Sequence, residues 1–109
     1  AALKPRLESP RYTKPRTARR AHRVRIDNTS SSLFTIVEVF AYDFPGLLFS
    51  IADALFRCEL DIWVAKIATK VDQVVDVFYV RDTTGQKVDA ADRVAAVKEA
   101  VMARLPKIA

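Results

Sequence analysis

A Pro-Gly pair separates an apolar run from the start of a helical pattern. The segment reads Asp43-Phe44-Pro45-Gly46-Leu47-Leu48. Where a strand leads into a helix N-terminus, free backbone amides and a partial positive charge form a seat for a carboxylate. Gly46 lets a ligand approach the backbone, Pro45 costs no hydrogen bond in a first turn, and Asp43 is placed to take an ammonium group. The segment fits a seat for a free α-amino acid, and it fits a purely structural turn equally well.

Residue types typical of catalysis are sparse elsewhere. His22 and Cys58 are the only histidine and cysteine of the chain. We expect His22 to be exposed at the edge of a linker and Cys58 to behave as a small apolar residue. The chain has no phosphate-binding glycine loop, no Cys/His metal spacing, and no RNA-recognition signature in residues 74–80. The sequence therefore predicts neither catalysis nor a cofactor within these 109 residues.

Basic charge is concentrated at the N-terminal end. Residues 1–25 contain nine Lys/Arg and one Glu, a net charge of +8, whereas residues 26–109 contain nine basic and twelve acidic residues, a net charge of −3. Pro5, Pro10 and Pro15 argue against a regular element there. We interpret residues 1–22 as a basic linker and residues 23–109 as the folded domain. Binding of nucleic acid or an acidic partner by the linker is the less favoured alternative, because aromatic residues do not alternate with the charges.

Hydrophobic periodicity indicates the elements that position the Pro-Gly segment. β-branched and aromatic residues predict strands at residues 23–27, 33–42, 60–69 and 74–80. A last helix is expected after Asp89, which would cap it with Asp92 at the third helical position. A first helix after Gly46 is predicted from one apolar face, formed by Leu47, Leu48, Ile51, Ala52, Leu55 and Phe56.

The order of these elements predicts an α+β fold, with two helices on one face of a four-stranded antiparallel sheet. This is the ferredoxin-like arrangement permuted to ββαββα, because the first strand can occupy the place of a missing last strand. The helix-free face is then expected to expose large apolar residues and to need a partner. No apolar run approaches the roughly 20 residues of a membrane span, so no membrane partner is predicted.

The Pro-Gly segment also resembles a known family. Its pattern is similar to that of the ACT domain, a small amino-acid-sensing regulatory module. Four further segments resemble more closely the C-terminal ACT domain of bifunctional uridylyltransferase/uridylyl-removing enzymes, over about residues 23–105. These segments are VRIDN at 24–28, TIVEVF at 35–40, AKIAT at 65–69 and DVFYV at 76–80.

The resemblance implies a regulatory domain of a cytoplasmic bacterial enzyme that acts on the PII nitrogen-signalling protein. The parent would carry a nucleotidyltransferase domain and a uridylyl-removing hydrolase domain, with magnesium as its cofactor. L-Glutamine would be the effector, and another ACT domain, in a homodimer or as a tandem neighbour, would be the partner. The implied ligand-binding residues are Asp43, Phe44, Pro45, Gly46, Leu47, Leu48, Ile62 and Val64. The implied interface residues are Trp63, Ala65 and Ile67.

Two residues depart from the family pattern. Phe44 stands where arginine is common, and Glu59 stands where a glycine commonly ends the first helix. A side chain at a left-handed helix end introduces strain. The substitution at position 44 leaves open an alternative function, an ACT-type interaction or dimerisation module that binds no ligand.

Overall fold

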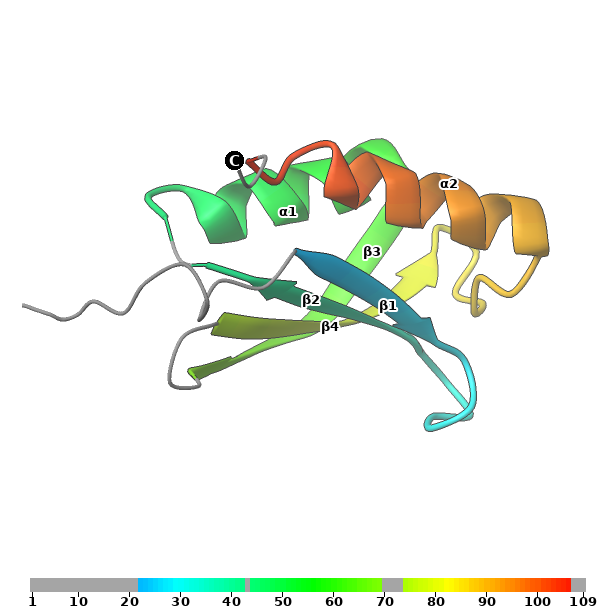
Figure 1. The fold of residues 1–109 in the computed structure, drawn as a ribbon. Helices are drawn as coiled ribbons and strands as arrows, with labels where there is room; N and C mark the ends of the chain where they lie inside the picture. Colours follow the sequence, from blue (N-terminus) through cyan, green and yellow to red (C-terminus); the bar gives the residue numbers. More distant parts are fainter. Residues whose placement is uncertain (1–21, 43, 70–73, 107–109) are drawn as a thin grey trace, which may run out of the picture.

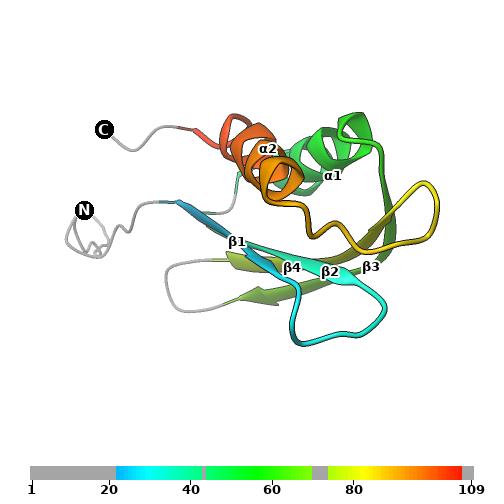
Figure 2. The same cartoon turned by 90° about the vertical axis from the view of Figure 1, so that its right-hand side faces the viewer.

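A computed structural model of the chain describes residues 22–42, 44–69 and 74–106. The four strands form one antiparallel sheet in the order β1-β2-β4-β3, and both helices lie on the same face of it (Figures 1 and 2). The predicted ferredoxin-like fold, permuted to ββαββα, is confirmed. The elements are β1 (Arg23–Asp27), β2 (Thr35–Ala41), α1 (Leu47–Arg57), β3 (Leu60–Thr69), β4 (Val74–Asp82) and α2 (Ala91–Met102).

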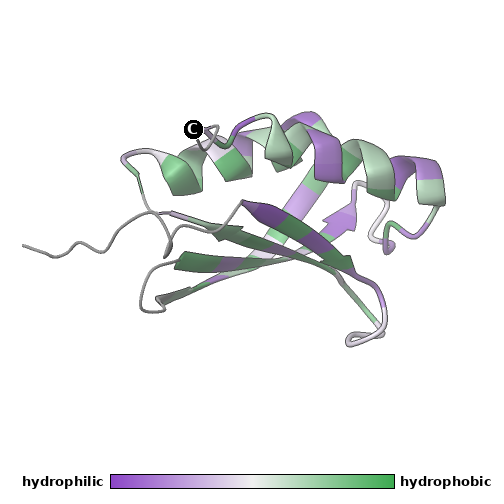
Figure 3. Ribbon diagram, in the orientation of Figure 1, coloured by the Kyte–Doolittle hydropathy of each residue, from purple (hydrophilic) through white to green (hydrophobic). Residues whose placement is uncertain are grey.

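The strand register decides which residues form the core. Val37 of β2 lies opposite both Ile26 of β1 and Phe78 of β4, so these side chains share the face beneath the helices. Phe78 is the largest fully buried side chain, and Val37 is completely buried. Hydrophobic residues follow β2 and β4 through the middle of the sheet (Figure 3). The helices complete the core with Leu47, Ile51, Ala54, Leu55, Val97 and Val101.

α1 exposes more apolar surface than its periodicity predicts. Ile51 and Leu55 are buried, but Leu48 is 41% exposed and Phe56 is 74% exposed. Phe49 is exposed as well. The prediction of one buried face that includes Leu48 and Phe56 was wrong. The reason is that α1 packs mainly against β3 and α2 at one side of the domain, so only a narrow stripe of the helix meets other elements.

Several element boundaries also differ from the prediction. β2 begins at Thr35 rather than at residue 33. The reason is that Phe34 still belongs to the preceding turn, where its backbone amide donates a hydrogen bond to the Ser31 hydroxyl. α2 begins after Ala90, which makes no side-chain cap, so the expected cap by Asp89 was wrong. Asp92 nevertheless lies in the first turn of α2, where its charge is favourable.

α1 ends at a left-handed residue. Glu59 has a φ of 62°, and it is the one non-glycine residue with positive φ in the described ranges. An L-residue in this conformation costs about 1–2 kcal/mol, of which the greater freedom of an unfolded glycine offsets about half. We therefore expect Glu59→Gly to raise the free energy of unfolding by about 0.5–1 kcal/mol in urea denaturation.

The matched control for this substitution is Glu99→Gly, because Glu99 is an exposed residue inside α2. Glycine in a helix interior lowers stability by about 0.5–1 kcal/mol, so the two variants should shift the unfolding midpoint in opposite directions. A loss of stability in both variants would contradict strain at Glu59.

The helix-free face of the sheet is partly covered by its own cationic side chains. The Arg23 guanidinium lies 4.2 Å from the centre of the Phe40 ring, and the Arg81 guanidinium lies 4.3 Å from the centre of the Trp63 ring. Such side chains place their apolar stems over the sheet while the charge stays near water. Ile36 is buried on this face.

The expected apolar exposure on the helix-free face is therefore reduced but present, with Trp63 58% and Val64 42% exposed there. The other exposed large apolar side chains of α1 and β3 are Leu48, Phe49, Phe56, Ile62 and Ile67. In the part of the chain that the structure describes, neither helix is long and apolar enough to cross a membrane.

Candidate functional site

A hollow of about 290 Å³ lies where the N-terminal end of α1 meets the end of β3 and the beginning of β4. This volume lies just below the usual range for small-molecule sites, which begins at about 300 Å³. The size therefore suits a small ligand. The hollow is lined by Phe44, Gly46, Leu47, Leu48, Phe49, Ile67, Val74 and Asp76.

The N-terminal end of α1 contributes positive potential to this hollow. Gly46 is the N-cap residue, with a left-handed φ of 84°, and its carbonyl oxygen accepts the Ser50 amide at 2.8 Å. No described side chain caps the helix, and its first turn contains no acidic residue. The amides of Leu48 and Phe49 lie in that first turn, where a helix offers no acceptor of its own. They are available as donors to an anion in the hollow.

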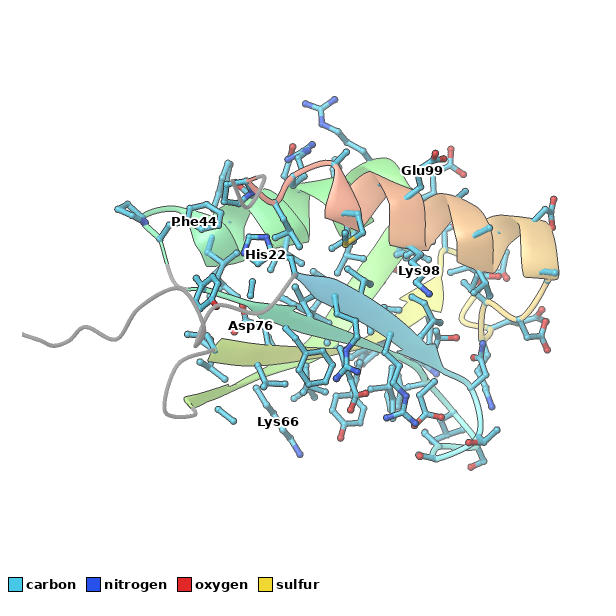
Figure 4. All side chains as sticks on the ribbon, in the orientation of Figure 1. His22, Phe44, Lys66, Asp76, Lys98 and Glu99 are labelled. Atoms are coloured by element: carbon cyan, nitrogen blue, oxygen red, sulfur yellow. The ribbon has the colours of Figure 1, made fainter. Side chains whose placement is uncertain are left out.

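A buried carboxylate lies in the same hollow. Asp76 of β4 is only 2% exposed, and it lies opposite Val39 of β2 and Ile67 of β3, on the helix side of the sheet. Figure 4 places it at the same end of the sheet as Phe44. Carboxylates are rarely this buried unless they are paired, and Asp76 does make an interaction within the protein. The hollow therefore has the N-terminal amides of α1 at one side and, at another, a buried acidic residue that already makes an interaction within the protein.

Sequence reasoning missed Asp76, although a signal was present. Asp76, Phe78 and Val80 alternate along β4 and so share one face. Phe78 and Val80 are typical core residues, so the same alternation predicts that the side chain of Asp76 also points toward the core.

His22 lies at the same end of the sheet and is buried, with 8% of its surface exposed. The centre of its ring lies 5.8 Å from the centre of the Tyr42 ring, in an edge-on arrangement. Nε2 of His22 has no hydrogen-bond partner among the described residues. The expectation of an exposed histidine in the linker was wrong. His22 lies two residues before Val24 of β1, so the two side chains point to the same face of the sheet, beneath the helices.

The structure brings together four of the predicted ligand-loop residues. Phe44, Gly46, Leu47 and Leu48 all line the hollow, whereas the exposed Pro45 does not. Asp43 lies outside the described residues. The predicted ligand contacts Ile62 and Val64 lie further along β3, outside the lining and on either side of a β-bulge.

The predicted interface residues all lie on β3, at the edge of the sheet. Ile67 lines the hollow and is 59% exposed, so it belongs both to the strand edge and to the candidate site. Ala65 is exposed on the same strand. Trp63 packs on the helix-free face, where its ring meets Phe34 and Arg81.

An ion-pair network holds α1 in place. The Arg104 guanidinium donates to Asp53 at 2.7 Å and to the Ser50 carbonyl at 3.0 Å, and Arg57 donates to Asp53 at 3.0 Å. The hydrogen bonds from Arg104 and then Arg57 keep the pKa of Asp53 below its ordinary value. This network ties the first half of α1 to the segment after α2, and so fixes the helix whose N-terminal end lines the hollow.

The chemistry available in the hollow is that of binding. Among the described residues, its lining contains one carboxylate and no histidine, cysteine, serine or lysine. Within the described ranges, no group of three or more His, Cys, Asp or Glu side chains is placed to hold a metal ion. The arrangement can hold a small molecule that carries a negative group for the α1 amides.

Comparison with known proteins finds relatives that share one name. A bifunctional uridylyltransferase/uridylyl-removing enzyme from Azospirillum brasilense is 37% identical over 95 residues, which is 87% of this chain and 10% of that protein. Enzymes of the same name from Novosphingobium aromaticivorans and Gluconobacter oxydans are 44% and 45% identical, over 72% and 76% of this chain. No family profile and no solved structure matches the chain.

The match covers most of this chain but little of the relatives. The chain spans 10% of the Azospirillum protein and 9% of each of the other two. The resemblance seen in the sequence is confirmed. This chain belongs to the family of bifunctional uridylyltransferase/uridylyl-removing enzymes, of which it represents one small segment.

Proposed function

We propose that the chain is an ACT-type regulatory domain that binds a free α-amino acid, L-glutamine, in the hollow at the N-terminal end of α1. The observation that carries this proposal is the uncapped first turn of α1, which opens into the hollow. The ligand carboxylate would accept hydrogen bonds from the amides of Leu48 and Phe49. Gly46 keeps the approach free, because no described atom outside its own stretch of chain lies within 4 Å of the place where a Cβ would be.

The name of the relatives suggests what such binding would control. We propose that the parent enzyme adds uridylyl groups to the PII protein and removes them, and that glutamine shifts the balance between the two activities. A ligand can do this only if it binds one state of the enzyme more tightly than the other. Magnesium chemistry would belong to the catalytic domains outside this chain.

A second domain of the same kind would dock beside β3. In the described part of the sheet, β3 pairs with β4 on one side only, and residues 61–68 are exposed. An edge strand with free backbone groups is a template for pairing. Ile67 lies on this edge and also lines the hollow, so a docked domain would lie close to the bound ligand. The same edge supports the alternative function, an interaction module that binds no ligand.

Isothermal titration with L-glutamine tests the proposal, with L-serine as a control. We expect glutamine to bind, and to raise the free energy of unfolding by about 2.7 kcal/mol at a hundredfold excess over Kd. Sedimentation of the same samples reports whether the chains associate. Association without any glutamine binding, in this chain and in a longer piece that includes the neighbouring domain, would favour the interaction module and reject the sensor.

A further inference from the structure

We infer that the helix-free face of the sheet, where β3 meets β4, is the docking surface for a second copy of this chain. The two sheets pack face to face, and Arg81 of each copy pairs with Asp61 of the other copy. This contact goes beyond the proposed amino-acid site, requires no bound ligand, and uses a different surface from the outer edge of β3.

The guanidinium of Arg81 is held in place without an anionic partner. It lies 4.3 Å from the centre of the Trp63 ring and 5.0 Å from the centre of the Phe34 ring. Of its nitrogens, only Nε is buried without a hydrogen-bond partner, and no described residue accepts a hydrogen bond from the other two, so these are open to the surface. The rings therefore orient a cation that still lacks an acceptor.

The matching anion lies on the same face. Asp61 of β3 is exposed and lies directly opposite Arg81 in the register of β3 and β4. Side chains opposite each other across two strands are about 5 Å apart and can pair. Asp61 nevertheless forms no ion pair with any described residue, because the Arg81 guanidinium lies over the aromatic rings instead. Each copy therefore presents an unpaired cation beside an unpaired anion.

A two-fold axis makes these two charges complementary. When the axis runs parallel to the strands between β3 and β4, each residue of β4 lies over its β3 register partner in the other copy. Arg81 then meets Asp61 on both sides of the axis, and Tyr79 meets Val64 in the same way. Such a contact uses the same surface on both copies and closes as a dimer. Two sheets packed face to face are aligned within about 30° and lie about 10 Å apart.

Side chains suited to an interface surround these charges. Trp63 is 58% exposed and Val64 is 42% exposed, and the β-bulge between Ile62 and Val64 leaves both on this face. The Lys66 ammonium lies 5.1 Å from the centre of the Tyr79 ring. Tryptophan, tyrosine and arginine contribute most of the binding energy in many protein interfaces. The face therefore combines apolar anchors with charges that they partly shield from water.

The balance of charge on this face favours a copy of itself over a nucleic acid. Alternation along the strands places both signs there: Arg23, Arg25, Lys66 and Arg81 with Asp27, Glu38 and Asp61. A phosphate backbone would meet the acids as well as the cations. Residues 26–109 also have a net charge of −3, which opposes a polyanion. A second face with both signs can match each charge with its opposite.

The test is charge reversal combined with mixing, measured by sedimentation equilibrium in the absence of ligand. Asp61→Arg and Arg81→Asp are each measured alone and then together in an equimolar mixture. Glu99→Arg is the matched control, because Glu99 is an exposed acid on α2 and its reversal changes the net charge by the same amount as Asp61→Arg. Circular dichroism and thermal unfolding show whether each variant is folded.

We expect the unchanged chain and Glu99→Arg to dimerise equally well. Each reversal alone should raise the dissociation constant of the dimer by at least about tenfold, because like charges then face each other. The mixture should associate again, because one copy presents arginine at both positions and the other presents aspartate at both. Recovery of this kind is specific for the face, since Arg81 lies on β4, one strand inside the edge.

Trp63→Ala tests the apolar part of the contact, independently of whether Arg81→Asp folds. We expect this substitution to raise the dissociation constant of the dimer by more than about tenfold. Phe56→Ala is its control, because it removes another aromatic ring that is 74% exposed, but from α1. The dimer of this control should dissociate as the dimer of the unchanged chain does.

Three results would overturn the inference. One is a chain that stays monomeric at about 1 mM. Another is a dimer that neither reversal weakens, which would place the contact elsewhere, such as at the edge of β3. The third is a monomeric chain that binds a short single-stranded oligothymidylate and loses this binding in Trp63→Ala, which would assign the face to nucleic acid.

Discussion

Phe78→Ala is expected to lower the free energy of unfolding by about 3–5 kcal/mol. Phe78 is the largest fully buried side chain among the described residues, and it lies on the central strand β4, between β2 and β3. Its removal loses apolar burial and leaves a cavity that the surrounding sheet cannot close completely. Since small domains are stable by only about 5–15 kcal/mol, urea denaturation should show a large shift of the midpoint.

Phe56→Ala is the matched control for this core substitution. The same side chain is removed, but Phe56 is 74% exposed on α1. Its loss should change stability by no more than about 0.5 kcal/mol. Similar losses at the two positions would contradict the packing of α1, because the helical periodicity alone places Phe56 in the core.

Gly46→Val is expected to weaken glutamine binding by more than about tenfold, to the point of abolishing it at ordinary concentrations. Gly46 has a φ of 84° at the start of α1, a conformation that a β-branched residue avoids. Relief of this strain would move the first turn, and with it the amides of Leu48 and Phe49. The affinity for L-glutamine, measured by isothermal titration, checks this expectation.

Gly85→Val is a close structural control for Gly46→Val. Gly85 also has a φ of 84°, and a Cβ at either glycine would meet no heavy atom within 4 Å. The backbone strain should therefore be similar, at about 1–2 kcal/mol of unfolding free energy. Only the variant at Gly46 should lose glutamine binding, because Gly85 lies in the turn after β4. Equal loss of binding in both would indicate a general effect of stability.

The larger part of the fold could be predicted from the sequence. β1 and β3 have the predicted bounds, and the ββαββα order, the single sheet and the position of both helices on one face are all confirmed. These features follow from local rules, since alternation and helical spacing are properties of neighbouring residues. The Pro-Gly pair also marked the beginning of α1, where Gly46 and Leu47 line the hollow.

Errors arose where an outcome depends on which elements meet in space. Leu48 and Phe56 have the spacing of core residues, yet α1 lies at the side of the sheet, where both side chains remain exposed. His22 follows a proline-rich basic segment, yet the register of β1 turns it inward. In each case the residue type and its spacing were compatible with both burial and exposure.

The sequence by itself determined the elements, their order and the start of α1 after the Pro-Gly pair, because these depend on backbone preferences and on short-range periodicity. Only the tertiary structure decided that Asp76, 30 residues after Gly46 in the numbering, lies in the same hollow as the α1 amides. That proximity is set by pairing β4 between β2 and β3 and by packing α1 over β3. The hollow is lined by residues of separate elements, so it becomes visible only when long-range pairing has placed those elements together.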